Sequence, residues 1–116
     1  MPEKKIKILG EEVTIAFNMA VEIEYEEMTG AAFDLDKLAE AKTKGALQLS
    51  AAAIKANNPD TAITYKRLTK EAGPVETATL INTTVDALKE WLRVPEVYAK
   101  EVAEDTEADT EDGPKN

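Results

Sequence analysis

The residues of this chain that could do chemistry are mainly carboxylates. Adjacent or near-adjacent acids stand at Glu26-Glu27 and at Asp34 with Asp36. Two carboxyls can hydrolyse a glycosidic bond when they flank one cleft and burial raises the pKa of one of them. Both pairs fall where the pattern predicts solvent-facing helix surfaces or helix caps. We therefore expect no catalytic pair among them.

Other kinds of chemistry lack their usual residues. Cysteine and histidine are both absent, which removes thiol nucleophiles, thiolate ligands, the commonest general base and the commonest metal ligand. The acidic segment Asp105–Gly113 lacks the ligand spacing of an EF-hand calcium loop. The five glycines are scattered and form no phosphate-binding loop. The sequence predicts a protein that is not an enzyme and that has no catalytic residues, cofactor or metal ion.

The acidic charge is concentrated at the C-terminal end. The net charge is −9, and residues 104–116 alone hold six acids and one lysine. We expect one domain over residues 1–103, followed by a disordered acidic tail over 104–116. The negative field disfavours nucleic acid and anionic lipid as partners. No secretory signal or apolar run of about 18 residues is present, so we expect a cytoplasmic protein.

The N-terminal residues have the period of strands. Apolar and polar residues alternate, with the apolar positions at Ile6, Ile8, Val13, Ile15 and Phe17. This alternation predicts two half-buried strands, over residues 4–9 and 12–17. Gly10 lies between them and can adopt the positive φ of a tight turn. We therefore expect a two-stranded hairpin that lays one face on helices or pairs with another chain.

The remainder of the domain has helical signals, and we expect a mainly α fold in which the hairpin precedes a compact bundle of four to five helices. The first helix runs from Met19 to Thr29, between the N-cap residue Asn18 and the terminating Gly30. A second helix begins after Asp34, is weakened at residues 43–45, and is strong from there to Asn57.

Two further helices follow a loop at residues 57–60. Ile63 and Leu68 flank Thr64 as a hydrophobic staple flanks an N-cap, which predicts a short helix to Ala72. Pro74 begins the longest uninterrupted amphipathic helix. Its apolar stripe, widened by Trp91, has helical spacing and consists of Ala78, Ile81, Val85, Leu88 and Leu92. Pro95 ends or kinks this helix, and residues 96–103 add one or two turns.

The first helix offers two apolar flanks. At 100° per residue, Met19 and Ile23 lie on one side of a polar stripe, and Val21, Tyr25 and Met28 lie on the other. Either the domain covers both flanks, or one flank is kept for a partner. Under the second alternative, the candidate partner-binding residues are Val21, Tyr25 and Met28.

The segment from Phe17 to Gly30 resembles the opening of the small tail assembly chaperones of long-tailed, siphovirus-type bacteriophages and prophages. There, as here, a hairpin leads into a helix that ends in Glu-Glu-x-Thr-Gly, at Glu26–Gly30 in this chain. The alanine-rich helix closed by residues 57–60 and the later helix ending at residues 90–92 are also similar. The resemblance covers most of residues 4–95.

The resemblance implies a mainly helical protein without catalytic residues. Such a protein binds the phage tape-measure protein in the bacterial host cytoplasm, keeps it soluble, helps to recruit tail-tube protein, and is absent from the mature virion. Two alternatives remain open. One is a structural tail or head-completion protein that stays in the virion, and the other is a generic bacterial helical adaptor. Self-association into a homo-oligomer is also left open.

The last three residues suggest a further hypothesis. Members of the resembled family often make a longer product by a ribosomal frameshift near the end of the short reading frame. Residues 114–116, Pro-Lys-Asn, can be encoded by a run that contains A-AAA-AAC, a slippery sequence. Under this hypothesis the chain is the shorter product of such a pair.

Overall fold

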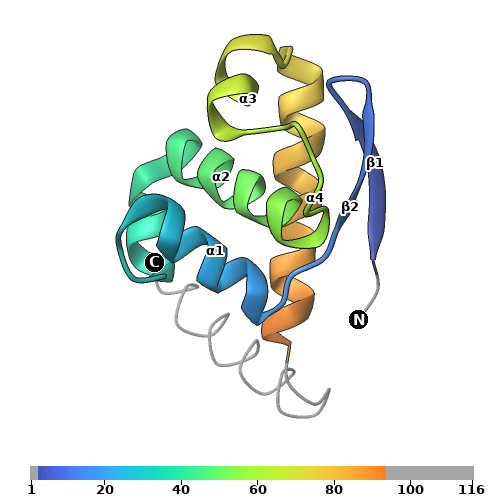
Figure 1. Cartoon of the computed structure of the whole chain (residues 1–116). Coiled ribbons are helices and arrows are strands. Elements are labelled where there is room, and N and C mark those ends of the chain that lie inside the picture. The colour runs from blue at the N-terminus through green and yellow to red at the C-terminus, as the bar shows by residue number, and fades with distance from the viewer. Residues whose placement is uncertain (1–2, 94–116) are drawn as a thin grey trace, which may run out of the picture.

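The computed structural model describes residues 3–93, which form a two-stranded hairpin and four helices (Figure 1). In chain order these are β1 (Lys4–Ile8), β2 (Glu11–Ile15), α1 (Met19–Thr29), α2 (Leu35–Asn57), α3 (Tyr65–Glu71) and α4 (Pro74–Leu92). The prediction of a mainly helical fold behind an N-terminal hairpin is confirmed. The predicted turns at 96–103 and the predicted tail at 104–116 lie outside the described residues.

The hairpin is closed by a two-residue turn. The strands pair antiparallel, with Ile6 opposite Val13. Gly10 has the predicted positive φ, 81°, and Leu9 before it also has a positive φ, 52°. Two positive φ values in succession match the primed turns that suit the twist of a hairpin. Leucine adopts this conformation at a cost in free energy, so other contacts must hold the turn in place.

Local signals place the helix ends as predicted. The side chain of Asn18 accepts a hydrogen bond from the backbone N–H of Val21 at 3.2 Å, and Gly30 ends α1 with a φ of 72°. Thr64 caps α3 in the same way, because its hydroxyl accepts from the N–H of Arg67 at 3.1 Å. Pro74 occupies the first turn of α4.

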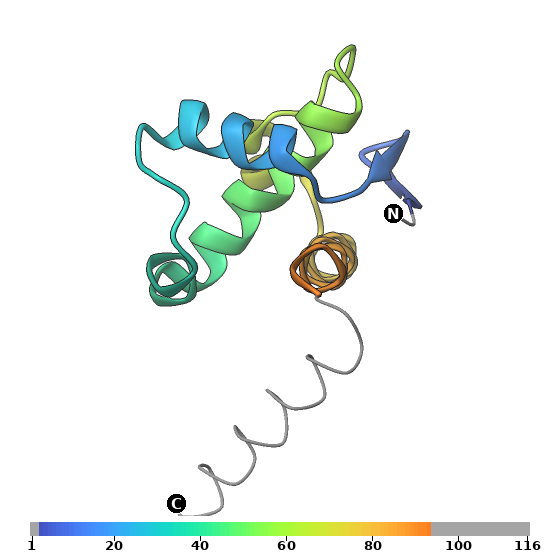
Figure 2. The ribbon, with the colours of Figure 1, turned by 90° about the horizontal axis from the view of Figure 1, so that it is seen from below.

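Helix α2 is kinked at Lys42, next to the predicted weak point at residues 43–45. Lys42 has φ 54° and ψ −126°, which no helical residue adopts. The kink separates residues 35–41, which we call the α2 arm, from the long buried part of α2. Figure 2 shows the arm turned away from that part. A Cβ at Gly45 would lie 2.8 Å from Ala41 Cβ and 2.9 Å from Leu38 O, so the kinked backbone leaves room only for glycine there.

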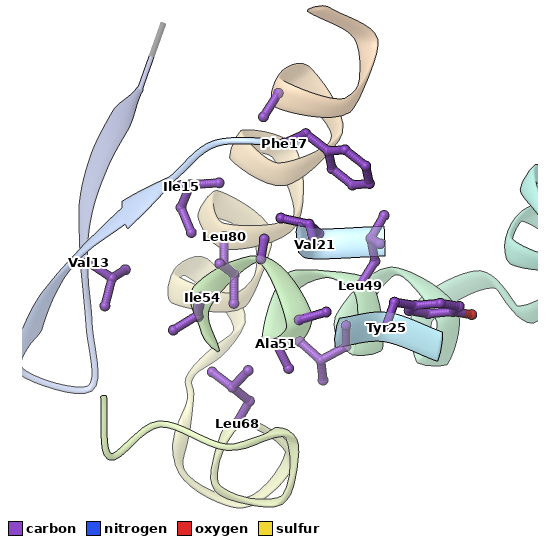
Figure 3. Packing of buried hydrophobic residues seen from close by; sticks show 14 of the residues in the cluster. Val13, Ile15, Phe17, Val21, Tyr25, Leu49, Ala51, Ile54, Leu68 and Leu80 are labelled. Carbon is purple, nitrogen blue, oxygen red and sulfur yellow. The ribbon is translucent and has the colours of Figure 1, made fainter. Parts of the chain in front are cut away.

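The buried part of α2 forms the centre of the core. The hairpin, α1, α3 and α4 all contact α2 or one another around it. Figure 3 shows side chains from each of these elements meeting beside α2. The largest fully buried apolar side chains come from every element and its flanking residues: Phe17, Ile8, Ile15, Leu49, Ile54, Leu68, Leu80, Val13 and Val21.

Helix α4 buries a face next to the predicted stripe. Its buried residues are Leu80, Thr84, Ala87 and Leu88, so only Leu88 belongs to both sets. The stripe residues Ala78 and Leu92 are exposed, and Ile81 and Val85 are half-buried. The reason is that α4 contacts both the hairpin and α2, which turns a face containing a threonine inward. The hydroxyl of Thr84 is satisfied there because it donates to the carbonyl of Leu80 at 3.0 Å.

Candidate functional site

The predicted partner-binding flank of α1 faces mostly inward. Val21 is 0% exposed and Tyr25 is 8% exposed, and both belong to the core cluster (Figure 3). The ring of Tyr25 stands edge-on to that of Phe33, with centroids 5.7 Å apart. Met28 is the exception, since 38% of it is exposed. Val21 and Tyr25 are therefore core residues in this structure, and a partner reaches only Met28 without rearranging the domain.

The opposite flank of α1 is the exposed one. Met19 is 54% exposed and Ile23 is 50% exposed. They lie four residues apart, so their side chains are neighbours on one side of the helix. The sequence shows two apolar flanks but gives no sign of which one the rest of the domain covers. The structure settles that choice in favour of Val21 and Tyr25 as the buried side.

Carboxylates border the exposed pair. Helix α1 contains Glu22, Glu24, Glu26 and Glu27 and no basic residue. We call these four glutamates, with Met19 and Ile23, the α1 outer face. Glu26 accepts a hydrogen bond from the N–H of Phe33 at 2.9 Å. Within residues 3–93, the ion pairs are Lys4–Glu90 and Arg67–Glu71, so none neutralises a glutamate of α1.

A second apolar surface lies between the α2 arm and α4. It is a groove of about 230 Å³, which we call the arm–α4 groove. Its lining is almost entirely aliphatic and comprises Leu35, Leu38, Ala39, Lys42, Ala46, Leu49, Thr84, Val85 and Leu88. The groove exists because the kink at Lys42 holds the arm off the bundle while part of the α4 stripe is left uncovered. The sequence signal for this groove is the apolar stripe of α4, because most of its residues are not buried in the core.

A third hollow, of about 350 Å³, lies where α1, α2 and α3 meet. Met28 is one of its walls, and its other lining residues are Glu24, Ala51, Lys55, Thr61, Ile63, Thr64, Tyr65 and Lys66. Lys55 is engaged at one side, because its ammonium donates to the carbonyl of Pro59 at 3.2 Å. The mixture of acid, bases and apolar atoms gives this hollow no single preference in charge.

Two of the acids that the sequence singled out, Glu26 and Asp34, accept hydrogen bonds from the backbone. Asp34 Oδ1 accepts from the N–H groups of Asp36 and Lys37, at 2.9 and 3.2 Å, and so caps α2. Over residues 3–93, no three His, Cys, Asp or Glu side chains gather into a group that could hold a metal ion. The bidentate hydrogen bond from Arg67 lowers the pKa of Glu71, and the same contact raises the pKa of Arg67. This pair is an exposed i,i+4 contact on α3 rather than part of a cleft.

No helix in the described part of the chain has both the length and the apolar character needed to cross a membrane. Comparison with known proteins gives no match at any level. No family model fits the chain, no curated protein is similar to it, and no solved structure resembles its fold.

Proposed function

We propose that this protein is a tail assembly chaperone of a long-tailed bacteriophage or prophage. It binds the tape-measure protein in the bacterial cytoplasm, keeps it soluble, helps to recruit tail-tube subunits, and is left out of the finished virion. The resemblance of residues 4–95 to that family supports the proposal. The arm–α4 groove is the structural observation that carries it.

The groove has the form that helix-in-groove recognition requires. Leu35 and Leu38 line it from the arm, Val85 and Leu88 line it from α4, and Leu49 comes from the buried part of α2. An amphipathic helix places apolar side chains at i, i+3, i+4 and i+7 into such a channel. A tape-measure protein is a long helix-rich chain with exposed apolar faces, so many of its segments fit this requirement.

The charge of the chain suits the same role. A bound client hides its apolar surface in the groove, and the net charge of −9 then keeps the complexes apart by repulsion. Two effects thus oppose aggregation of the client: its apolar surface is buried, and the bound protein carries a net negative charge.

Co-expression with the tape-measure protein tests the proposal. The groove variant is Leu35→Glu, and Leu35 is 45% exposed in the first turn of α2. The matched control is Val75→Glu, since Val75 is 80% exposed in the first turn of α4 and does not line the groove. We expect the wild type and the control to raise the soluble fraction of the tape-measure protein, and the groove variant to raise it less. If the tape-measure protein is equally insoluble with and without the wild type, the proposal fails.

Two cheaper observations separate the alternatives. A structural tail or head-completion protein remains in the particle, so mass spectrometry of purified virions would detect it, whereas a chaperone is missing. A generic bacterial adaptor has no fixed gene position, whereas a chaperone gene lies between the tail-tube and tape-measure genes.

A further inference from the structure

We propose that the α1 outer face docks an amphipathic helix of the client protein whose apolar stripe is bordered by lysines and arginines. This inference rests on the proposed function for the identity of the client. It deepens that function by assigning a second contact surface and by stating the sequence that this surface selects.

The α1 outer face is held in one orientation before any partner arrives. Val21 and Tyr25 anchor the helix from behind, and both ends of α1 are capped, by Asn18 and Gly30. A partner therefore meets a fixed ridge and does not lose affinity by ordering it. In Figure 1, α1 lies at the surface of the bundle.

The ridge has the composition of one half of a helix–helix seam. Two apolar side chains, Met19 and Ile23, stand one turn apart at its centre, and each is about half exposed. By the rotation of the helix, Glu22 and Glu26 border them on one side, and Glu27 and Glu24 border them on the other. In two-helix seams, acidic residues flanking the apolar positions select partners that carry bases at the facing positions.

The charge is specific to this helix and does not simply reflect an acidic surface. Residues 3–93 contain 15 acidic and 12 basic side chains, a net charge of −3. Helix α1 alone contributes −4, so the rest of the described domain is close to neutral. Acidic flanks on a partner helix would place like charges opposite each other, which lowers affinity and excludes such partners.

A second copy of this chain does not supply the matching helix from its described residues. The large apolar side chains with the greatest exposure are Met19, Ile23, Met28, Leu35, Val75 and Leu92. None of these residues forms a pair of exposed apolar side chains one helical turn apart with lysine or arginine on both sides of the pair. The helix richest in bases is α3, with Lys66, Arg67 and Lys70, and its central apolar residue Leu68 is buried. The expected occupant is therefore a different protein.

Two synthetic helical peptides of about 20 residues provide the probes, a length at which a helix can persist alone. Both carry the same leucines at i and i+4 spacing. One has lysines along both borders of the leucine stripe, and the other has glutamates. Affinity is measured by fluorescence anisotropy with the full-length chain, at about 0.1 M and about 1 M salt, where the screening length falls from about 10 Å to about 3 Å.

The matched variants change the same total charge in different places. Glu22→Lys with Glu27→Lys reverses one glutamate on each side of Met19 and Ile23 and leaves the Glu26 contact to Phe33 intact. Asp60→Lys with Asp86→Lys makes the same change at two exposed positions outside α1. Glu22→Gln with Glu27→Gln is measured as well, so that a folding defect in the reversed variant does not decide the result. Circular dichroism verifies the fold of each variant.

We expect the wild type to bind the lysine-bordered peptide at least about tenfold more tightly than the glutamate-bordered one, a difference worth about 1.4 kcal/mol. High salt should reduce this preference. The α1 reversal should abolish or invert it, the glutamine variant should weaken it, and the Asp60/Asp86 control should retain it. Ile23→Gln should weaken binding of the lysine-bordered peptide several-fold.

Three results would overturn the inference. The first is equal affinity for the two peptides, and the second is an equal loss in the control, which would mean that only total charge matters. The third is a change of sedimentation coefficient in the α1 variants without peptide, which would assign the face to self-association. If the α1 reversal still solubilises the tape-measure protein fully, this inference fails while the proposed function stands. If the wild type binds the peptides as expected but does not solubilise that protein, the proposed function fails instead.

Discussion

The side-chain amide of Asn58 pairs with the backbone of Thr14 as an adjacent strand would. Its Oδ1 accepts from the Thr14 N–H at 3.0 Å, and its Nδ2 donates to the Thr14 carbonyl at 2.8 Å. The same Nδ2 also donates to the carbonyl of Ile54 at 2.8 Å. Asn57 makes the donating half of this arrangement, because its Nδ2 donates to the carbonyls of Ala16 and Ala53. The end of α2 thus satisfies the open edge of β2.

Replacing Asn58 by aspartate should destabilise the domain strongly. A carboxylate oxygen would then face the carbonyls of Thr14 and Ile54, so two hydrogen bonds are lost and the oxygens repel. We expect the free energy of unfolding to fall by about 2–3 kcal/mol, measured by urea denaturation. Asn82→Asp, at an exposed position of α4, is the control and should change it by less than about 0.5 kcal/mol. Equal effects at the two positions would mean that the pairing with Thr14 contributes nothing.

Glu76 fastens the hairpin turn to the start of α4. Its Oε2 accepts from the N–H of Leu9 at 2.6 Å, and its Oε1 accepts from the N–H of Gly73. Glu76→Ala removes both contacts and frees a turn that contains a leucine at positive φ. We expect a loss of about 1.5–3 kcal/mol, together with faster hydrogen exchange at Leu9. Asp86→Ala on the same helix should leave the exchange at Leu9 unchanged, and slow exchange in both variants would contradict the role of Glu76.

Truncation should destabilise the domain much more on one flank of α1 than on the other. Val21→Ala removes a fully buried side chain and should lower the free energy of unfolding by about 2 kcal/mol. Ile23→Ala removes a larger but half-exposed side chain and should change it by less than about 0.5 kcal/mol. Thermal unfolding of the two variants side by side measures the difference. A larger loss of unfolding free energy in Ile23→Ala than in Val21→Ala would mean that the flank of Ile23, and not that of Val21, is buried in the core.

Because α2 is kinked, glycine substitutions in it should have effects opposite to those in a regular helix. Lys42→Gly should raise the free energy of unfolding by up to about 1 kcal/mol, because glycine adopts the observed φ of 54° without strain. Gly45→Ala should lower the free energy of unfolding, although alanine is the better helix former by about 1 kcal/mol, because its Cβ would press on Ala41 and on the carbonyl of Leu38. Urea denaturation measures both. A continuous, unkinked helix would give the opposite sign at both positions.

Features fixed by neighbouring residues were the ones that the sequence predicted well. The alternation around Gly10, the cap at Asn18 and the staple around Thr64 each depend on a few adjacent positions, and each prediction is confirmed. The buried face of α4 depends on what packs against it. Thr84 can be buried because its hydroxyl donates a hydrogen bond to a carbonyl of the same helix. A pattern of apolar residues does not reveal such a buried threonine.

The candidate site was predicted in part. The pattern identified α1 as a helix with two apolar flanks but could not orient it, so the flank of Val21 and Tyr25 was chosen and Met19 and Ile23 were not. The sequence predicts Asn57 and Asn58 only as the place where a helix meets a loop, because side-chain hydrogen bonds to Ala16 and Thr14, more than 40 positions away, have no local signature. The arm–α4 groove likewise depends on the kink in α2. The sequence predicts a weak point in the helix near the kink but not the direction in which the arm turns.

The contact of the first strand with the last described helix sets an order on synthesis. Lys4 approaches Glu90 at 3.9 Å, and the hairpin turn hangs on Glu76. In a nascent chain, the apolar face of the hairpin therefore stays exposed to solvent until α4 has left the ribosome. Only then can the hairpin pack against α4. Helix α4 ends at Leu92, only 22 residues before codon 114. Under the frameshift hypothesis, the end of α4 is therefore still inside the ribosomal exit tunnel when the ribosome slips, and closure follows the choice of product. The short and long products share the hairpin and the four described helices, so both would fold the same N-terminal domain.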